Sequence, residues 1–410
     1  MMQVPEPAFK QDVLDIMRQL PLAHQSQPQQ QHLPVERVCG PNLESVGRPG
    51  VPFQVQAIEV QAREHAGSIF TLTHDPANDA IITTGRDGKM VAWTPDGSAK
   101  QTLQLDNYYA CSADVNIRQQ SLLLCGVARD SNTSQPSACI FLFKRANGAG
   151  PWARVGILPR PEMKIVTAVR CIGNGSSNTF ATGEQRASNA STAHQRKDCV
   201  CVYDASSGPF ESLQAQTVYW EHSDIITCLA AHPHDSELFF SGSKDSTVKL
   251  WDKRMGNSSA GTMGGSMPDG SFRPGHTQMI TCIDTFDHTL VSAGLDEKLL
   301  VWDIRMMASP TAGACAPVKQ IEVGQQAILK IAAASTAGPV GSAGLVAVSS
   351  VRGLFVVRIC DGEVVRASPP TSRPQAQPYH DLKWTSLGLW AGGEDKVLDR
   401  FNVRPAVYAQ

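Results

Sequence analysis

The chain has 410 residues, of which 42% are hydrophobic and 18% are charged, and its formal net charge is −2. This near balance of charge argues against a protein that binds nucleic acid or an anionic membrane surface. No run of about eighteen apolar residues occurs, so we expect no membrane-spanning helix. Because the first residues include Glu6, Asp12 and Asp15 and no apolar stretch, we expect no signal peptide or mitochondrial presequence, and a cytoplasmic or nuclear location.

Residues 1–52 are predicted to form an extension separate from the rest of the chain. Residues 8–20 are expected to form a short amphipathic helix, which Pro21 ends. Its apolar stripe consists of Phe9, Val13, Ile16, Met17 and Leu20. Residues 25–32, polar and rich in Gln, are expected to be a disordered linker. A helix this short is marginal alone, so it packs either on the rest of the chain or on a partner protein, and both alternatives stay open.

The most informative part of the chain is an internal repeat. Residues 276–305 are a near-copy of residues 221–254. The first copy predicts three short strands, at residues 225–231, 238–241 and 247–251, with turn residues between them. Such a unit cannot bury its apolar face alone and needs neighbours of the same shape. The repeat therefore predicts an all-β fold.

Four polar or aromatic positions recur at matched offsets in three places. In each set the hydroxyl residue lies four positions before the Asp, and the Trp lies six after it. The sets are His65, Thr83, Asp87 and Trp93; His222, Ser241, Asp245 and Trp251; and His276, Ser292, Asp296 and Trp302. The same residue types make up Ser-His-Asp hydrolase triads, but three copies at repeat spacing indicate a structural device. We therefore expect no catalytic residue among them.

This pattern resembles the WD-repeat β-propeller family. The resemblance implies that in each set the Asp accepts a hydrogen bond from the His, the His meets the hydroxyl, and the hydroxyl meets the indole N–H. A buried polar network of this kind must be fully satisfied, and once satisfied it fixes one geometry. Propellers host many unrelated functions, so the architecture says little about the biochemical role.

Weaker units of similar length bring the predicted number of blades to seven. They cover residues 108–145, 164–204, 327–361 and 380–403. In the second of these units Tyr203-Asp204 stands in the Trp-Asp position. In the last, Ala391, Asp395 and Phe401 fall at the hydroxyl, Asp and Trp positions.

The last unit stops after its third strand. Residues 53–63 alternate in polarity with a slip after Ala57, and we expect them to supply the missing outer strand, which removes an exposed sheet edge. The predicted fold is a seven-bladed propeller over residues 53–405, closed by its N- and C-terminal strands and followed by a tail at 406–410.

Three segments are longer than a blade needs. Residues 129–138 and 183–198 each connect the second and third strands of a blade, and the resemblance places such loops on a face used for binding. Residues 255–275 are rich in Gly and Ser and must include or replace an outer strand, whose position stays open. Each segment is either a partner contact or a tolerated insertion.

No metal, disulfide or cofactor is expected. The eleven cysteines include no CxxC pair, and Cys199 and Cys201 fall on one face of a strand, which is typical of small buried side chains in a reducing compartment. Residues 232–235, His-Pro-His-Asp, lie in a turn and lack a fourth ligand, so they are a weak metal pattern. Residues 261–265 are Gly-rich but precede no helix, so they do not predict a phosphate loop.

Two consecutive repeats end in the motif Trp-Asp-x-Arg, as Trp251-Asp252-x-Arg254 and Trp302-Asp303-x-Arg305. These ends resemble the box found in substrate receptors of cullin-4 ubiquitin ligases. The resemblance implies that Arg254 and Arg305 lie on the bottom face and contact the ligase adaptor, helped by a helix such as residues 8–20. Arg suits this role because its planar guanidinium makes paired hydrogen bonds and is often a binding hot spot.

The primary prediction is a non-enzymatic scaffold for protein–protein interaction, working in a multiprotein complex. The alternative is a cullin-4 receptor that binds its adaptor through Arg254 and Arg305. A remote alternative is a propeller hydrolase, which would need convergent carboxylates or histidines in the central channel.

Overall fold

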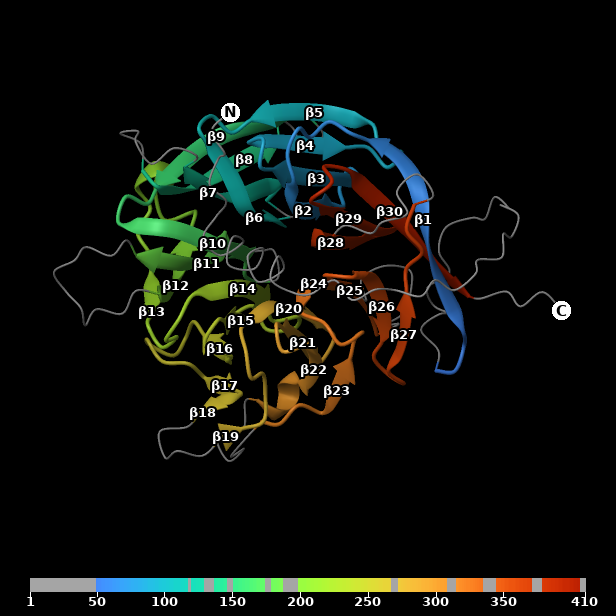
Figure 1. Ribbon diagram of the computed structural model, residues 1–410. Coiled ribbons are helices and arrows are strands. Elements are labelled where there is room, and N and C mark those ends of the chain that lie inside the picture. Colours follow the sequence, from blue (N-terminus) through green and yellow to red (C-terminus); the bar gives the residue numbers. More distant parts are fainter. Residues whose placement is uncertain are drawn as a thin grey trace.

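Seven four-stranded antiparallel sheets surround a central axis, as Figure 1 shows. The structure, a computed structural model, describes residues 49–116, 119–128, 136–145, 150–173, 178–186, 198–266, 272–307, 315–334, 344–370 and 378–405. Each sheet is one blade of a propeller, and the predicted all-β, seven-bladed fold is confirmed.

The first three blades follow one another along the chain, and each begins with its innermost strand. Blade 1 consists of β2 (Ile69–Asp75), β3 (Ala80–Gly85), β4 (Lys89–Trp93) and β5 (Ala99–Gln104). Blade 2 consists of β6 (Tyr108–Asn116), β7 (Ser121–Ala128), β8 (Ala138–Arg145) and β9 (Trp152–Pro159). Blade 3 consists of β10 (Met163–Cys171), β11 (Thr179–Arg186), β12 (Asp198–Asp204) and β13 (Thr217–Tyr219), with the short 3-10 helix η2 (Phe210–Ser212) before β13.

The remaining four blades complete the ring. Blade 4 consists of β14 (Ile226–Ala231), β15 (Leu238–Ser243), β16 (Val248–Asp252) and β17 (Gly261–Met263). Blade 5 consists of β20 (Ile280–Phe286), β21 (Thr289–Gly294), β22 (Lys298–Asp303) and β23 (Lys319–Glu322), with the 3-10 helix η3 (Ile304–Met306) after β22. Blade 6 consists of β24 (Ile328–Ala333), β25 (Leu345–Ser350), β26 (Gly353–Arg358) and β27 (Glu363–Arg366). Blade 7 consists of β28 (Tyr379–Thr385), β29 (Gly388–Gly393), β30 (Leu398–Pro405) and β1 (Phe53–Ala62).

The N-terminal strand closes the ring. In Figure 1, β1 (blue) lies beside β30 (red), and the two strands pair antiparallel. Their register shifts between Ile58 and Ala62, close to the slip in polarity seen in the sequence. The same strand touches blade 6, because the N–H of Ser368 donates to the carbonyl of Val55 at 2.9 Å. Closure by both ends of the propeller, as expected from residues 53–63, therefore also links blade 7 to blade 6.

Neighbouring blades are joined near the axis by threonine hydroxyls. Each donates to the carbonyl of the first residue in the next inner strand, with Thr167 to Ile226 at 2.6 Å, Thr227 to Ile280 at 2.7 Å and Thr281 to Ile328 at 2.7 Å. Gly242 permits the close approach of blades 4 and 5, since a Cβ there would lie 2.9 Å from Cγ2 of Ile280. The Ile and Thr of the repeated Ile-Thr-Cys segment thus make the hydrogen bonds that link neighbouring blades.

The Gly/Ser-rich segment that follows β16 contains the outer strand of blade 4, whose position could not be predicted from the sequence. Strand β17 pairs with β16 and completes blade 4. Two further short strands, β18 (Gly265–Ser266) and β19 (Phe272–Arg273), pair with each other in a separate small sheet.

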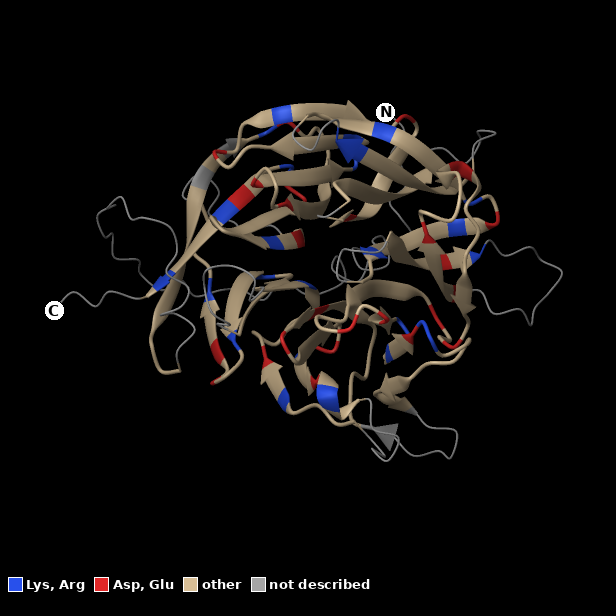
Figure 2. Cartoon of the chain, turned by 180° about the vertical axis from the view of Figure 1, so that it is seen from behind, with Lys and Arg blue, Asp and Glu red and all other residues tan. Residues whose placement is uncertain are grey.

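Basic and acidic residues are interspersed over the blades (Figure 2). In the part of the chain that the structure describes, no helix is long and apolar enough to cross a membrane. The helix expected at residues 8–20, with Phe9, Val13, Ile16, Met17 and Leu20, lies outside the described residues, as do residues 25–32, 129–135 and 187–197.

Candidate functional site

In blade 4 the His, Ser, Asp and Trp of the repeat form one buried hydrogen-bonded chain. His222 Nδ1 lies 2.8 Å from Asp245 Oδ2, and His222 Nε2 lies 2.7 Å from Ser241 Oγ. The indole N–H of Trp251 donates to the same Ser241 Oγ at 2.7 Å. Both imidazole nitrogens and the hydroxyl are therefore engaged inside the blade.

Blades 1 and 5 repeat this geometry. The hydroxyl oxygen lies 2.7 Å in blade 1 and 2.8 Å in blade 5 from both the imidazole Nε2 and the indole nitrogen. The residues are His65, Thr83, Asp87 and Trp93 in blade 1, and His276, Ser292, Asp296 and Trp302 in blade 5. The three indoles are at most 1% exposed. A buried hydroxyl that is hydrogen-bonded to both an indole and an imidazole links the segments of the blade that carry these three residues.

Low pH should weaken these three hydrogen-bonded networks. Burial acts to raise the pKa of Asp245, but hydrogen bonding, first from His222, outweighs it and holds the pKa well below its usual value. The pKa values of Asp87 and Asp296 are lowered in the same way. A depressed folded-state pKa contributes stability above the unfolded pKa, near 3.9, and this stability is lost as the pH falls below that value.

We therefore expect the free energy of unfolding to drop between about pH 4 and pH 2, with a shallower drop in Asp245→Asn. The substitution removes one titrating carboxyl while keeping the side chain's shape. Denaturant unfolding across this pH range checks the expectation, and equal slopes for the two proteins would contradict it.

Blade 3 uses a different network, which the sequence did not reveal. Tyr203, in the Trp position, donates its hydroxyl to Glu184 Oε1 at 2.8 Å, and Thr182 donates to the same oxygen at 2.7 Å. Arg160 Nη2 donates to Glu184 Oε2 at 2.8 Å. A fully buried carboxylate that accepts four hydrogen bonds from three residues here replaces the imidazole network. The Tyr203-Asp204 pair was the one signal of this position in the sequence.

The two Trp-Asp-x-Arg motifs place two guanidiniums at the same end of neighbouring blades. Arg254 donates from Nε and Nη2 to the two oxygens of Asp252, each at 2.8 Å. Arg305 makes the same pair of bonds to Asp303, at 2.9 Å and 2.6 Å. The side chains of Arg254 and Arg305 are 56% and 65% exposed. Each aspartate therefore orients its guanidinium and leaves Nη1 to a further acceptor.

These bonds also keep both aspartates ionised. The hydrogen bond from Arg254 holds the pKa of Asp252 below its usual value, and Arg305 does the same for Asp303. Arg254 Nη2 lies 3.3 Å from Asp235 Oδ2 as well, so the turn between β14 and β15 belongs to the same end of blade 4.

Two large hydrophobic side chains directly follow the arginines. Met255 is 48% exposed and Met306 is 58% exposed. They are two of the four large hydrophobic residues that are exposed among the described residues. We call Arg254, Met255, Arg305 and Met306 the Arg–Met rim. An exposed methionine beside an oriented arginine is thus repeated on adjacent blades.

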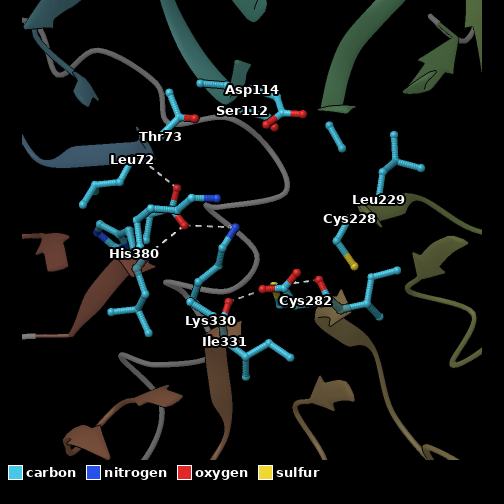
Figure 3. Close-up of a pocket in the computed structure, with 18 of the residues that line it drawn as sticks. Leu72, Thr73, Ser112, Asp114, Cys228, Leu229, Cys282, Lys330, Ile331 and His380 are labelled. Atoms are coloured by element: carbon cyan, nitrogen blue, oxygen red, sulfur yellow. Dashed lines mark hydrogen bonds and ion pairs between the residues drawn. The ribbon is translucent and has the colours of Figure 1, made fainter. Parts of the chain in front are cut away.

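A second concave site lies on the propeller axis. A cavity of about 200 Å³ is lined by residues from the inner strands of all seven blades. Figure 3 shows Asp114, Cys228, Cys282 and Lys330 around it. Lys330 forms an ion pair with Asp381 at 3.1 Å, and although burial acts to lower the pKa of Lys330, this carboxylate holds it above its usual value.

The channel carboxylates are engaged in joining blades. Each accepts a backbone N–H from the next inner strand, with Asp114 accepting from Cys171 at 2.8 Å, Asp284 from Ala333 at 2.8 Å and Asp381 from Leu72 at 2.6 Å. These bonds link blade 2 to 3, blade 5 to 6 and blade 7 to 1. These three carboxylates of the channel thus hold neighbouring blades together.

Comparison with known proteins places two blades in one family. The family described as WD domain, G-beta repeat matches residues 214–252 and 268–303, which contain the inner three strands of blades 4 and 5. The LEC14B protein of Lithospermum erythrorhizon is 30% identical over 118 residues, which are 28% of this chain and 22% of that protein. A guanine nucleotide-binding protein subunit beta of Oryza sativa subsp. japonica is 24% identical over 206 residues, 50% of this chain and 49% of that protein.

A third relative carries a more specific name. The DDB1- and CUL4-associated factor 11 homolog of Caenorhabditis briggsae is 32% identical over 92 residues, 22% of this chain and 16% of that protein. The chain spans about half or less of the length of these three relatives. The ring of seven blades defines the class of fold, a β-propeller, and the family match shows that it contains WD repeats.

Proposed function

We propose that the chain is a non-enzymatic scaffold that binds other proteins, and that the Arg–Met rim is one of its contact surfaces. The observation that carries this proposal is the repeated pairing of an oriented, exposed Arg with an exposed Met on blades 4 and 5. Arg and Met are enriched in protein interfaces. A guanidinium already held in place by an aspartate loses less conformational freedom on binding.

The polar groups that a hydrolase would need have other partners in this fold. The hydroxyls of Thr83, Ser241 and Ser292 are each hydrogen-bonded to an indole and an imidazole in the core. These contacts favour a scaffold over a propeller hydrolase.

A second candidate is a substrate receptor of a cullin-4 RING ubiquitin ligase, bound to the ligase adaptor through Arg254 and Arg305. Two observations support it. The Trp-Asp-x-Arg motif occurs in consecutive blades with both guanidiniums exposed. A protein named as a DDB1- and CUL4-associated factor is among the relatives, over a short stretch.

Affinity purification of the tagged full chain under mild salt tests both candidates. We expect Arg254→Ala combined with Arg305→Ala to lose partners that the unmodified chain recovers, because a hot-spot side chain contributes about 2 kcal/mol or more to binding. The matched control is Arg154→Ala with Arg366→Ala, which removes two exposed arginines from the outer strands β9 and β27.

The identity of the lost proteins separates the two candidates. Loss of the cullin-4 adaptor in the rim variant alone supports the receptor, and loss of other proteins supports the general scaffold. Equal recovery of partners by the unmodified chain, the rim variant and the control variant would reject the rim as a contact surface.

A further inference from the structure

Two neighbouring turns beside the Arg–Met rim bring two histidines and a carboxylate together. His234 lies in the turn between β14 and β15, and Asp287 and His288 form the turn between β20 and β21. His234 Nε2 lies 3.4 Å from Asp287 Oδ1, and His288 Nε2 lies 3.8 Å from the same oxygen. One ligand atom from each residue lies within 4.8 Å of the others, and no other such group of three occurs in the described part of the chain.

These separations fit a tetrahedral metal ion. Zn²⁺ binds imidazole nitrogen and carboxylate oxygen at about 2.0–2.1 Å, which places two tetrahedral ligand atoms roughly 3.4 Å apart. The two distances to Asp287 Oδ1 are 3.4 Å and 3.8 Å and all three ligand atoms lie within 4.8 Å of one another, so an inward movement of these exposed side chains closes the site. The rings of His234 and His288 are 4.6 Å apart between centroids, so the two imidazoles are close enough to share one ion.

The turn in blade 4 is held in place by its own histidine. His232 Nδ1 accepts the backbone N–H of His234 at 3.2 Å and that of Asp235 at 2.9 Å. The His232 ring stacks on Phe240, with centroids 5.8 Å apart and planes at 23°. The backbone that carries His234 is therefore fixed before any ligand binds.

The turn in blade 5 is equally constrained. Asp287 has φ of 45°, the left-handed conformation that a two-residue turn needs and that Asp tolerates. The carbonyl of His288 accepts the N–H of Ile304 at 3.0 Å, which ties this turn to the end of β22. Both turns thus present their side chains from strands that the propeller holds in register.

We propose that His234, Asp287 and His288 bind a divalent transition-metal ion, Zn²⁺, across blades 4 and 5. The donor set of two imidazoles and one carboxylate suits this ion. The three side chains are 49%, 54% and 44% exposed, so the fourth position of the ion faces solvent. The three ligand residues are distinct from the bidentate Arg–Asp pairs, although the charge of Asp287 acts on neighbouring Arg305.

Calorimetric titration of the chelator-treated full chain with Zn²⁺ tests this proposal. We expect one equivalent to bind, with affinity at least roughly tenfold lower in His234→Ala and in His288→Ala, as loss of a metal-site group typically costs. The matched control is His74→Ala. His74 lies in β2, the inner strand of blade 1, and pairs with Asp79 at 3.2 Å, but it offers one imidazole alone to that carboxylate. His74→Ala should bind Zn²⁺ as the unmodified chain does.

Co²⁺ in place of Zn²⁺ reports which atoms hold the ion. Visible d–d bands that disappear in both variants, without a thiolate charge-transfer band, support the proposal. No saturable binding, binding unchanged in His234→Ala and His288→Ala, or a thiolate band would overturn it. Circular dichroism of the variants should match the unmodified chain, because these side chains are exposed.

Discussion

Trp251→Ala should lower the free energy of unfolding by about 3–5 kcal/mol, the cost of removing a large aromatic side chain from a core. Trp251 is fully buried, and its ring centroid lies 4.5 Å from that of Tyr219 in blade 3. Loss of the indole therefore leaves a void between two blades. The substitution also deprives Ser241 of its indole donor. Trp302→Ala should have a similar effect in blade 5.

Denaturant unfolding of the variants measures this effect. Trp251→Phe keeps most of the ring and loses the N–H, so it should cost less than Trp251→Ala. Val155→Ala, at a side chain that is 49% exposed, should change the free energy by no more than about 0.5 kcal/mol. A loss for Trp251→Ala as small as that for Val155→Ala would show that the indole does not hold the blade.

Val55→Asp should lower the free energy of unfolding by a similar or larger amount, about 4 kcal/mol or more, since it buries an unpaired charge in the closing strand. Val55 is 1% exposed in β1 and its neighbour Gln56 is exposed, because successive side chains of a strand point to opposite faces. Gln56→Asp is therefore the matched control, and it should change stability little.

Opening the ring should also change the protein's association. Without β1, the edge of β30 would offer unpaired backbone groups to another chain. We expect Val55→Asp to lower the midpoint of thermal unfolding and to form oligomers in light scattering after size exclusion. Indistinguishable behaviour of Val55→Asp and Gln56→Asp would mean that β1 does not close the propeller.

The parts of the fold that repeat at fixed offsets could be predicted from the sequence. The spacing from Ser241 to Asp245 to Trp251 recurs because each blade must place the same hydrogen-bonded chain between the same strands. The closing strand was predictable because residues 53–63 alternate in polarity and the last unit lacks a fourth strand. Both signals arise from local periodicity, which a single sequence preserves.

Features that do not repeat from blade to blade could not be predicted in this way. Glu184 replaces the imidazole network in blade 3 from a position two residues after the hydroxyl residue Thr182. Strand β17 comes from a Gly/Ser-rich segment whose side chains carry no alternation. His234 and His288 are distant in sequence, and only the stacking of blades 4 and 5 brings their turns together. The exposure of Met255 and Met306 likewise follows from where β16 and β22 end.

Hydrogen–deuterium exchange of the full chain, alone and in the complex that it recovers, tests most directly whether the Arg–Met rim binds partners. We expect slower exchange on binding at residues 232–237, 252–255, 286–288 and 303–307, which lie at the rim end of blades 4 and 5. Slower exchange confined to residues 244–247 and 295–297, at the other end of the same strands, would contradict the proposed contact surface.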